Sequence, residues 1–318
     1  MEFTYCKLID VLSDIHSGGT PSTEESSYWG GNIKWLSSGE TSQRFISDTV
    51  DKITEEGVKN SSTKLAKKNN IVMACAGQGK TRGQTSYLLD DMYINQSVIA
   101  LETKTSVLPL YLFYDLSSRY EELRGGSDAS STRGSITTTA LKNLPFKYPD
   151  LSTQQSIVDI LFGYDSLIEA NNRRIELLEQ AAQELYREWF VRFRFPGYED
   201  VKFENSLPEG WERNKIQKYY NTCSGGTPSR SKPEYFENGV YPWVKTGEIK
   251  DCVIIDTEEY ITQEAVNNSS AKVLPAKSVA MAMYGVNIGL LAYFDSEMTC
   301  NQACCVFSDK RDFSSKHY

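Results

Sequence analysis

Histidine, paired cysteine and long apolar runs are all scarce in this chain of 318 residues, and each scarcity argues against a class of protein. The two histidines, His16 and His317, give little support to a zinc site or to histidine-based catalysis. The seven cysteines form no Cys-x-x-Cys pair, which is typical of scattered reduced thiols and not of a disulfide framework. No window approaches about eighteen apolar residues, and the N-terminus lacks the zones of a signal peptide. We therefore expect no membrane span and a cytoplasmic location.

The composition that remains is that of a soluble globular protein of about two domains. Hydrophobic residues make up 40% and charged residues 24% of the chain, and the net charge is −8. An acidic balance argues against diffuse binding to nucleic acid, but it leaves room for a local basic surface.

The chain contains an internal repeat, visible as landmarks that recur in the same order. The motif Ser-Gly-Gly-Thr-Pro-Ser stands at Ser17–Ser22 and again at Ser224–Ser229. Residues Ile53–Ala74 match Ile261–Ala282 at ten of twenty-two positions. The other landmarks are a Trp followed by Gly-Glu, and an Asn-Gln pair: Trp35 with Gly39 and Glu40, Trp243 with Gly247 and Glu248, Asn95 with Gln96, and Asn301 with Gln302. Because these landmarks recur in the same order in two parts of the chain, the sequence predicts two related domains.

The repeat also sets the expected domain boundaries. We predict a first domain at residues 1–150, a long spacer helix at 151–195 and a second domain at 196–318. The second copy opens near Leu207 and reaches Tyr318, which corresponds to about residue 110 of the first copy, so we expect it to be incomplete.

Within each copy the pattern favours a mixed α/β fold with long polar loops. Short β-rich segments bounded by Gly, Asn, Pro or Ser predict strands at Ile33–Leu36, Ile71–Ala76, Tyr93–Leu101 and Leu144–Tyr148. A helix is expected at Leu108–Leu123.

The strongest periodic pattern runs from Ser152 to Phe195. Its residues step by four and three across nearly five heptads, as in the seam of a coiled coil. Ser152 is the predicted N-cap, Gln155 completes a capping box, and Pro196 ends the helix. The predicted helix-partner seam consists of Ile157, Leu161, Tyr164, Ile168, Asn171, Ile175, Leu178, Ala182, Leu185 and Trp189.

A helix of this length needs a partner, because an exposed apolar stripe on a rod on the order of 60 Å long is not stable alone. Asn171 would fix the register of that pairing. The alternative is an ordinary amphipathic helix that lies on its own domain.

These features together resemble the specificity subunit of type I restriction-modification enzymes over the whole chain. The resemblance rests on the Gly-Gly-Thr-Pro-Ser motif with the following Tyr28, Trp29 and Trp35, on Ile136 and Thr137 running into LKNLPFKYPDLSTQQSIVDIL, on the helix end LYREWFVRF and on LPEGWE. It implies that each domain is a target-recognition domain that reads one half of a split sequence in double-stranded DNA. It also implies a helical spacer that docks methyltransferase subunits.

By the same resemblance the subunit has no catalysis and no cofactor of its own. Methyltransferase subunits would use S-adenosylmethionine, and restriction subunits would use ATP. A second long helix, antiparallel to the first, is also implied after the second domain, and the sequence has none. We therefore expect a truncated product or working fragment, and we predict a homodimer in which the seam pairs with itself and Asn171 faces Asn171. The alternative is a scaffold that holds methyltransferase subunits without reading DNA.

Two polar, glycine-rich loops of the first copy are the candidates for DNA contact. They lie at residues 77–84 and 124–134, the first of them at the end of a basic segment that begins at Lys52. Glycine allows close backbone approach, and Gln, Lys and Arg side chains pair with base edges and phosphates. In the second copy, Arg230 and Lys232 follow the Gly-Gly-Thr-Pro-Ser motif instead. The candidate DNA-binding residues are Gln78, Lys80, Thr81, Arg82, Gln84, Arg124, Ser127, Thr132, Arg133, Arg230, Lys232 and Asn287.

The first loop also suggests a phosphate-binding P-loop, which would make the chain a nucleotide-dependent enzyme. That motif needs a glycine where Ala74 stands, and the repeat copy lacks the lysine. The sequence shows no nucleophile–base set and no carboxylate cluster with metal spacing. We therefore expect no enzymatic activity and no metal site.

Overall fold

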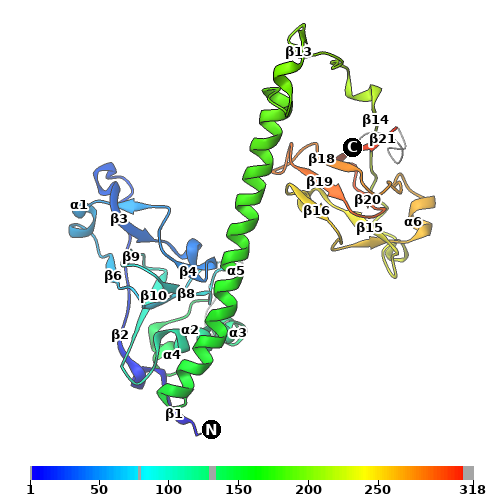
Figure 1. The fold of residues 1–318 in the computed structure, drawn as a ribbon. Coiled ribbons are helices and arrows are strands. Elements are labelled where there is room, and N and C mark those ends of the chain that lie inside the picture. Colours follow the sequence, from blue (N-terminus) through cyan, green and yellow to red (C-terminus); the bar gives the residue numbers. More distant parts are fainter. Residues whose placement is uncertain (1, 78–79, 129–133, 311–318) are drawn as a thin grey trace. The chain divides into compact units, whose positions relative to one another are not determined.

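The computed structural model describes residues 2–77, 80–128 and 134–310. The chain divides into two compact units, unit 1 at Met1–Leu185 and unit 2 at Tyr186–Tyr318 (Figure 1). Most of the predicted spacer helix therefore belongs to unit 1. The mixed sheets and the long helix confirm the predicted α/β fold class.

Unit 1 contains two main β-sheets and a separate strand pair. The five-stranded sheet has the order β2 (Leu12–Ser17), β10 (Val98–Thr103), β7 (Ile71–Ala74), β8 (Thr85–Leu88) and β4 (Phe45–Ile46). The four-stranded sheet has the order β5 (Lys52–Ile53), β3 (Trp29–Leu36), β9 (Met92–Ile94) and β6 (Lys64–Ala66). The pair joins β1 (Thr4–Lys7) to β11 (Pro145–Tyr148). The helices are α1 (Glu55–Lys59), α2 (Pro109–Ser118), α3 (Tyr120–Asp128), α4 (Thr138–Lys142) and α5 (Leu151–Tyr186).

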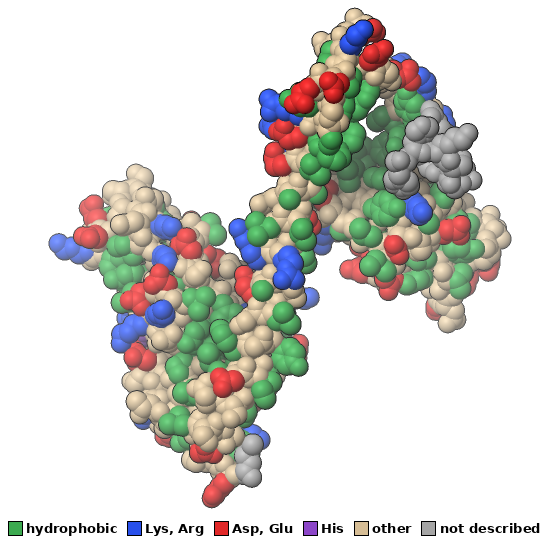
Figure 2. Space-filling view, in the orientation of Figure 1, with side chains coloured by type: hydrophobic (Ala, Val, Ile, Leu, Met, Phe, Trp, Pro, Cys, Tyr) green, Lys and Arg blue, Asp and Glu red, His purple; other side chains and the backbone are tan. Residues whose placement is uncertain are grey.

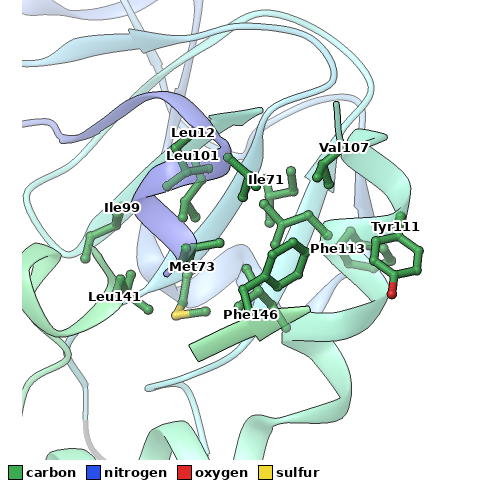
Figure 3. Packing of buried hydrophobic residues seen from close by; sticks show 14 of the residues in the cluster. Leu12, Ile71, Met73, Ile99, Leu101, Val107, Tyr111, Phe113, Leu141 and Phe146 are labelled. Carbon is green, nitrogen blue, oxygen red and sulfur yellow. The ribbon is translucent and has the colours of Figure 1, made fainter. Parts of the chain in front are cut away.

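The five-stranded sheet of unit 1 is covered on both faces, so β7 is buried at every position. One face shares a core with the four-stranded sheet, formed by Leu36, Ile46, Ala66, Val72, Leu88, Met92, Ile94, Val98 and Ala100. The other face packs under α2, α3, α4 and the start of α5. Figure 3 shows this second core, which includes Leu12, Ile71, Met73, Ile99, Leu101, Val107, Tyr111, Phe113, Leu141 and Phe146.

Unit 2 repeats this sheet topology, as the sequence landmarks predict. Its five-stranded sheet has the order β14 (Tyr220–Ser224), β21 (Cys304–Asp309), β18 (Val279–Ala282), β19 (Leu291–Phe294) and β16 (Cys252–Ile254). A second sheet has the order β17 (Tyr260–Ile261), β15 (Tyr241–Val244) and β20 (Thr299–Cys300). Unit 2 also contains the strand pair β12 (Phe203–Glu204) and β13 (Leu207–Pro208), helix α6 (Gln263–Asn267) and several short 3-10 helices.

The repeated motifs hold the two sheets of each unit together. Gly18 lies so close to β9 that a Cβ there would stand 1.8 Å from the carbonyl oxygen of Ile94. Trp35 Nε1 donates to the carbonyl of Gly19 at 3.2 Å. In unit 2 Trp243 Nε1 makes the equivalent bond to Gly226 at 3.0 Å. The glycines of the recurring Gly-Gly-Thr-Pro-Ser motif therefore have a structural role in both units.

The start of α5 differs from the predicted capping box. Asp150 accepts hydrogen bonds from the backbone N–H groups of Ser152 and Thr153, both at 3.0 Å. The prediction of Ser152 as N-cap was wrong, because the carboxylate of Asp150 reaches these N–H groups first. Gln155 donates instead to Asp159 at 2.7 Å.

Gln154 ties this start to unit 1. Its side chain is fully buried, donates to the carbonyls of Ser106 and Pro149, and accepts from the N–H of Leu108. The segment before α2 is thereby fastened to the first turn of α5.

Two other predicted elements are interrupted. The expected strand Tyr93–Leu101 is split into β9 and β10 by a turn at residues 95–97. The expected helix Leu108–Leu123 breaks at Arg119, so α2 and α3 are separate helices. At the other end of α5 a π-helical turn at Arg187–Val191 follows, and the chain leaves the helix at Phe193, whose φ is +57°.

Candidate nucleic-acid interface

The loop between β7 and β8 in unit 1 is closed at its base by two backbone hydrogen bonds between the ends of the strands. The N–H of Gly83 donates to the carbonyl of Ala74 at 2.9 Å, and the N–H of Ala74 donates to the carbonyl of Gln84 at 3.0 Å. Gly83 adopts a φ of +88°, a conformation that favours glycine. The strand ends therefore fix where the loop begins and ends.

The structure brings this loop together with both ends of the second predicted segment, which begins within helix α3 and not in a loop, and whose residues 129–133 lie outside the described residues. Tyr120 of α3 donates its hydroxyl hydrogen to the carbonyl of Lys80 at 2.8 Å and accepts from Arg124 Nη1 at 2.8 Å. Arg82 Nη1 donates to the carbonyl of Gly134 at 2.9 Å. We call residues 75–77 and 80–84 with Tyr120, Arg124 and Gly134 the double-loop site. Two segments far apart in the sequence thus form one surface.

The predicted DNA-binding residues of unit 1 occupy different positions in this site. Lys80 is exposed, and Thr81, Gln84 and Arg124 are half-buried. Arg82 is only 7% exposed. Its hydrogen bond to Gly134 makes it a residue that holds the two loops together, so the structure does not support direct base contact by Arg82.

The remaining candidates of unit 1 are not placed by the structure. Gln78, Thr132 and Arg133 lie outside the described residues, and Ser127 lies in α3. Sequence reasoning missed Tyr120, because it falls inside an expected helix and nothing in its neighbours points to a loop 40 residues away.

The equivalent loop of unit 2 has the same base but a different tip. The N–H of Gly289 donates to the carbonyl of Ala282 at 2.9 Å, and the N–H of Ala282 donates to Leu290 at 3.0 Å, which reproduces the bonds of Gly83 and Ala74. Residues 283–290 are two fewer than residues 75–84. The tip is apolar, with Val286 fully exposed and Ile288 65% exposed.

The three candidate residues of unit 2 are all engaged within the unit. Asn287 Nδ2 donates to the carbonyls of Thr246 at 2.9 Å and Ile249 at 3.0 Å, which anchors the loop. Arg230 lies over the ring of Phe236 at 4.4 Å and pairs with Glu259 at 2.5 Å. Lys232 donates to the hydroxyl of Tyr235 at 3.0 Å. The structure leaves Arg230 54% exposed, so its guanidinium remains accessible from outside.

The basic segment of unit 1 is partly neutralised. Lys52 pairs with Asp48 at 3.3 Å, and Lys67 pairs with Glu102 at 3.1 Å. Lys59, Lys64, Lys68 and Lys80 are exposed.

Helix α5 is fastened to unit 1 as far as Asp165. The carboxylate of Asp165 accepts from Arg44 Nε at 3.1 Å and from the hydroxyl of Tyr114 at 2.8 Å. Burial and this bond raise the pKa of Tyr114, so its hydroxyl stays protonated. The ring of Phe162 packs on Phe45 at 5.8 Å. This part of the helix fits the alternative of an amphipathic helix lying on its own domain.

Most of the predicted seam of α5 is exposed. Ile157 packs against the core of unit 1, and Trp189 is half-buried in the π-helical turn. Figure 2 shows hydrophobic side chains at the surface along the helix. The exposed seam residues are Leu161, Tyr164, Ile168, Asn171, Ile175, Leu178, Ala182 and Leu185.

Two searches concern other kinds of site. Across residues 2–77, 80–128 and 134–310, no three His, Cys, Asp or Glu side chains are grouped so that they could hold a metal ion. In the same part of the chain no helix has the length and apolar character needed to cross a membrane.

Comparison with known proteins identifies a repeated domain. The family model described as the type I restriction modification DNA specificity domain matches residues 2–180 and again residues 208–318. The two matches coincide with the two copies of the repeat.

Individual relatives carry the same description. The chain is 28% identical over 294 residues to the type I restriction enzyme MjaIX specificity subunit of Methanocaldococcus jannaschii, covering 89% of this chain and 66% of that protein. It is 30% identical over 202 residues to the EcoR124I/EcoR124II specificity subunit of Escherichia coli, covering 61% of this chain and 49% of that protein. The chain thus spans about half to two thirds of the length of these relatives.

A solved structure agrees with the fold. The crystal structure of a type I restriction-modification system S subunit from M. genitalium has a TM-score of 0.57 to this chain at 14% identity. The similarity covers 98% of this chain and 74% of that one.

Proposed function

Since the chain belongs to the family of type I restriction-modification specificity subunits, we propose that it reads a bipartite sequence in double-stranded DNA and positions methyltransferase subunits on it. The subunit is not the catalyst. We assign S-adenosylmethionine to the methyltransferase subunits and ATP to the restriction subunits, and we place the complex in the cytoplasm.

The observation that carries this proposal is the double-loop site of unit 1. The loop after β7 meets helix α3 and Gly134 there. These contacts are made to the backbone carbonyls of Lys80 and Gly134, which leaves the side chain of Lys80 exposed at the surface. A surface of this kind provides a cation for phosphate and polar side chains for base edges. Prior fixing of the loops lowers the entropy lost when DNA binds.

The difference between the two units supports a split target. The same backbone hydrogen bonds close the base of the loop in both units, whereas the loop tips differ in length, charge and apolar character. Two readers on one scaffold with different tips would recognise two different half-sites.

The first experiment is to sequence adenine methylation in cells that express this chain with methyltransferase subunits. We expect a single bipartite motif. Methylation that does not depend on the chain, or methyltransferase binding without retention on the motif, would favour a scaffold that no longer reads DNA.

The second experiment tests the site on the DNA that the first one defines. Lys80→Ala combined with Arg124→Ala should weaken binding of the assembled methyltransferase complex by about tenfold or more and reduce the salt dependence of binding. Lys7→Ala, a lysine on β1, is the matched control and should leave binding unchanged. Equal affinities for both variants would show that the double-loop site does not contact DNA.

The exposed seam of α5 favours a second role for the same chain as an assembly surface. We propose that the seam pairs with α5 of a second copy, giving a homodimer in which Asn171 lies opposite Asn171. Polar residues at such a position fix the register of paired helices. Methyltransferase subunits are the competing partners for this surface, and restriction subunits would join the same complex.

A further inference from the structure

Three side chains clamp helix α5 to unit 1. The carboxylate of Asp165 accepts two hydrogen bonds from Arg44, from Nε at 3.1 Å and from Nη2 at 3.0 Å. The hydroxyl of Tyr114 donates a third at 2.8 Å. Arg44 directly precedes β4, and Tyr114 belongs to α2 (Figure 1). We call these three residues the helix clamp, and it joins α5 to both a strand and a helix of unit 1.

The helix clamp holds a defined geometry. The side chain of Asp165 is only 11% exposed, so its charge is screened less than that of a surface carboxylate. A bidentate pair between a guanidinium and a carboxylate fixes the angle between the two groups as well as their distance. The guanidinium of Arg44 also lies over the rings of Phe113 at 5.1 Å and Tyr114 at 5.9 Å. Helix α2 therefore sets the position of the arginine that holds α5.

Asp165 marks the end of the contact between α5 and unit 1. Before it, Gln154, Ile157 and Phe162 all bond to or pack on unit 1. After it, every residue from Ser166 to Tyr186 is exposed. The helix clamp is therefore the outermost point at which unit 1 holds the direction of the helix.

The part of α5 beyond the clamp acts as a lever. From Asp165 to Tyr186 the helix continues for about 20 residues, which is roughly 30 Å at about 1.5 Å per residue. A swing of about 10° at the clamp would move Tyr186 by about 5 Å on a lever of that length. One base pair of DNA rises about 3.4 Å. A small loss of angular restraint therefore exceeds one step along the DNA.

We infer that the helix clamp fixes the spacing between the two half-sites by setting the direction in which α5 leaves unit 1. Its members are positioning residues, because they act through the helix and are assigned no contact with DNA. The inference rests on the proposed bipartite reading, in which α5 connects the reader in unit 1 to the reader of the other half-site. A freer clamp then admits motifs whose spacer is one base pair longer or shorter.

The test measures spacer selectivity on DNA whose half-sites stay constant. The methyltransferase complex is assembled with the full chain, and its affinity is measured for the native motif and for duplexes with one base pair added to or removed from the spacer. Asp165→Ala should reduce the preference for the native spacer by about tenfold or more, and the affinity for the native motif by less than about threefold. Glu169→Ala, on an exposed carboxylate one turn further along α5, is the control and should keep the wild-type preference.

A milder variant guards against a loss of folding. Tyr114→Phe removes one of the three hydrogen bonds and keeps the ring and the ion pair. It should reduce the preference for the native spacer by less than Asp165→Ala does. Circular dichroism checks that each variant is folded, and where Asp165→Ala is not, Tyr114→Phe carries the same comparison.

A second measurement follows the helix clamp without DNA. Spin labels at Lys59 on α1 and Glu179 on α5 report the distance between unit 1 and the helix. They are introduced as non-canonical amino acids, because the chain has seven cysteines. Double electron–electron resonance with unlabelled chain in excess should show a broader distance distribution for Asp165→Ala than for Glu169→Ala.

Four results would overturn the inference. An equally strict spacer in the wild type and in the clamp variants would do so and would leave the proposed function standing. An equal loss of affinity at every spacer length would make the clamp a stabilising contact only. Unchanged distance distributions would show that the clamp does not hold the direction of α5. Absence of any bipartite motif would contradict the proposed function, and this inference with it.

Discussion

The hydroxyl group of Tyr120 links helix α3 to the loop after β7. Tyr120 donates to the carbonyl of Lys80 and accepts from Arg124, so its oxygen is bonded on both sides. Its ring also lies beside Gly83, where an added Cβ would stand 3.4 Å from it. Tyr120 is therefore a positioning residue for the exposed Lys80.

Tyr120→Phe removes these two bonds and keeps the ring. We expect the affinity of the assembled complex for its DNA motif to fall by up to about tenfold, since a hydrogen bond contributes roughly 1 kcal/mol. The melting temperature should change little because Tyr120 is half-buried. Tyr5→Phe, on an exposed tyrosine of β1, is the control. An unchanged affinity would mean that the loops hold their geometry without Tyr120.

At the scale of elements, the first turn of α5 depends on an ionised side chain. Hydrogen bonds from Ser152 and Thr153 lower the pKa of Asp150 to about 2. A carboxylate at a helix N-terminus is also favoured by the helix dipole. Because the pKa is lower in the folded state than in the unfolded chain, the stabilisation is present above about pH 4 and is lost as the pH falls towards 2.

Asp150→Ala should therefore destabilise the chain by a constant amount above about pH 5, and the difference from the wild type should shrink as the pH falls to about 2. Urea unfolding followed by circular dichroism between these limits measures the difference. Asp159→Ala, on an exposed carboxylate about two and a half turns further along the helix, is the control. A difference that persists unchanged at pH 2 would show that the cap does not depend on charge.

An element can be predicted from the sequence when the residues that determine it lie within one segment, or within two segments that resemble each other. The heptad pattern of α5 is a periodic signal within one segment, and the repeat landmarks recur in the same order in two segments. The long helix and the presence of two related domains could therefore be predicted, but the strand orders of the sheets were not. The cap could not be placed correctly, because Ser152 and Asp150 are both good N-caps and only geometry selects between them. The turn that divides β9 from β10 lies at the polar residues Asn95, Gln96 and Ser97, which the expected strand spanned.

The double-loop site shows the limit for function. The sequence singles out two polar glycine-rich segments as candidates, but Arg82 and Gly134 are 52 residues apart, and nothing in either segment signals their hydrogen bond. For that reason Arg82 was predicted to face DNA, although it lies buried between the loops. Asn287 was likewise chosen for its amide, which the structure commits to backbone carbonyls.

At the scale of the whole molecule, the repeat keeps the sheet scaffold constant and changes what is attached to it. The loop tips differ between the units, and the helices that cover unit 1 have no described counterpart in unit 2. The long helix adds a third surface, whose apolar residues beyond Asp165 lie outside the core of unit 1. We expect other chains to cover the exposed apolar seam of α5, because burial of apolar surface is favourable.

The oligomeric state tests the seam of α5 directly. At tens of micromolar we expect the molar mass from light scattering to be twice that of one chain of 35.9 kDa. Leu178→Asp places a charge in the seam, where the wild-type side chain is 63% exposed in the single chain, and should return the protein to a monomer. Glu179→Ala on the same turn is the control and should stay dimeric.

Asn171→Leu should keep the dimer but loosen the register of the two helices. Double electron–electron resonance between spin labels on the two helices would detect this change as a broader distance distribution. A wild-type monomer at this concentration would exclude self-pairing and leave the seam to the methyltransferase subunits.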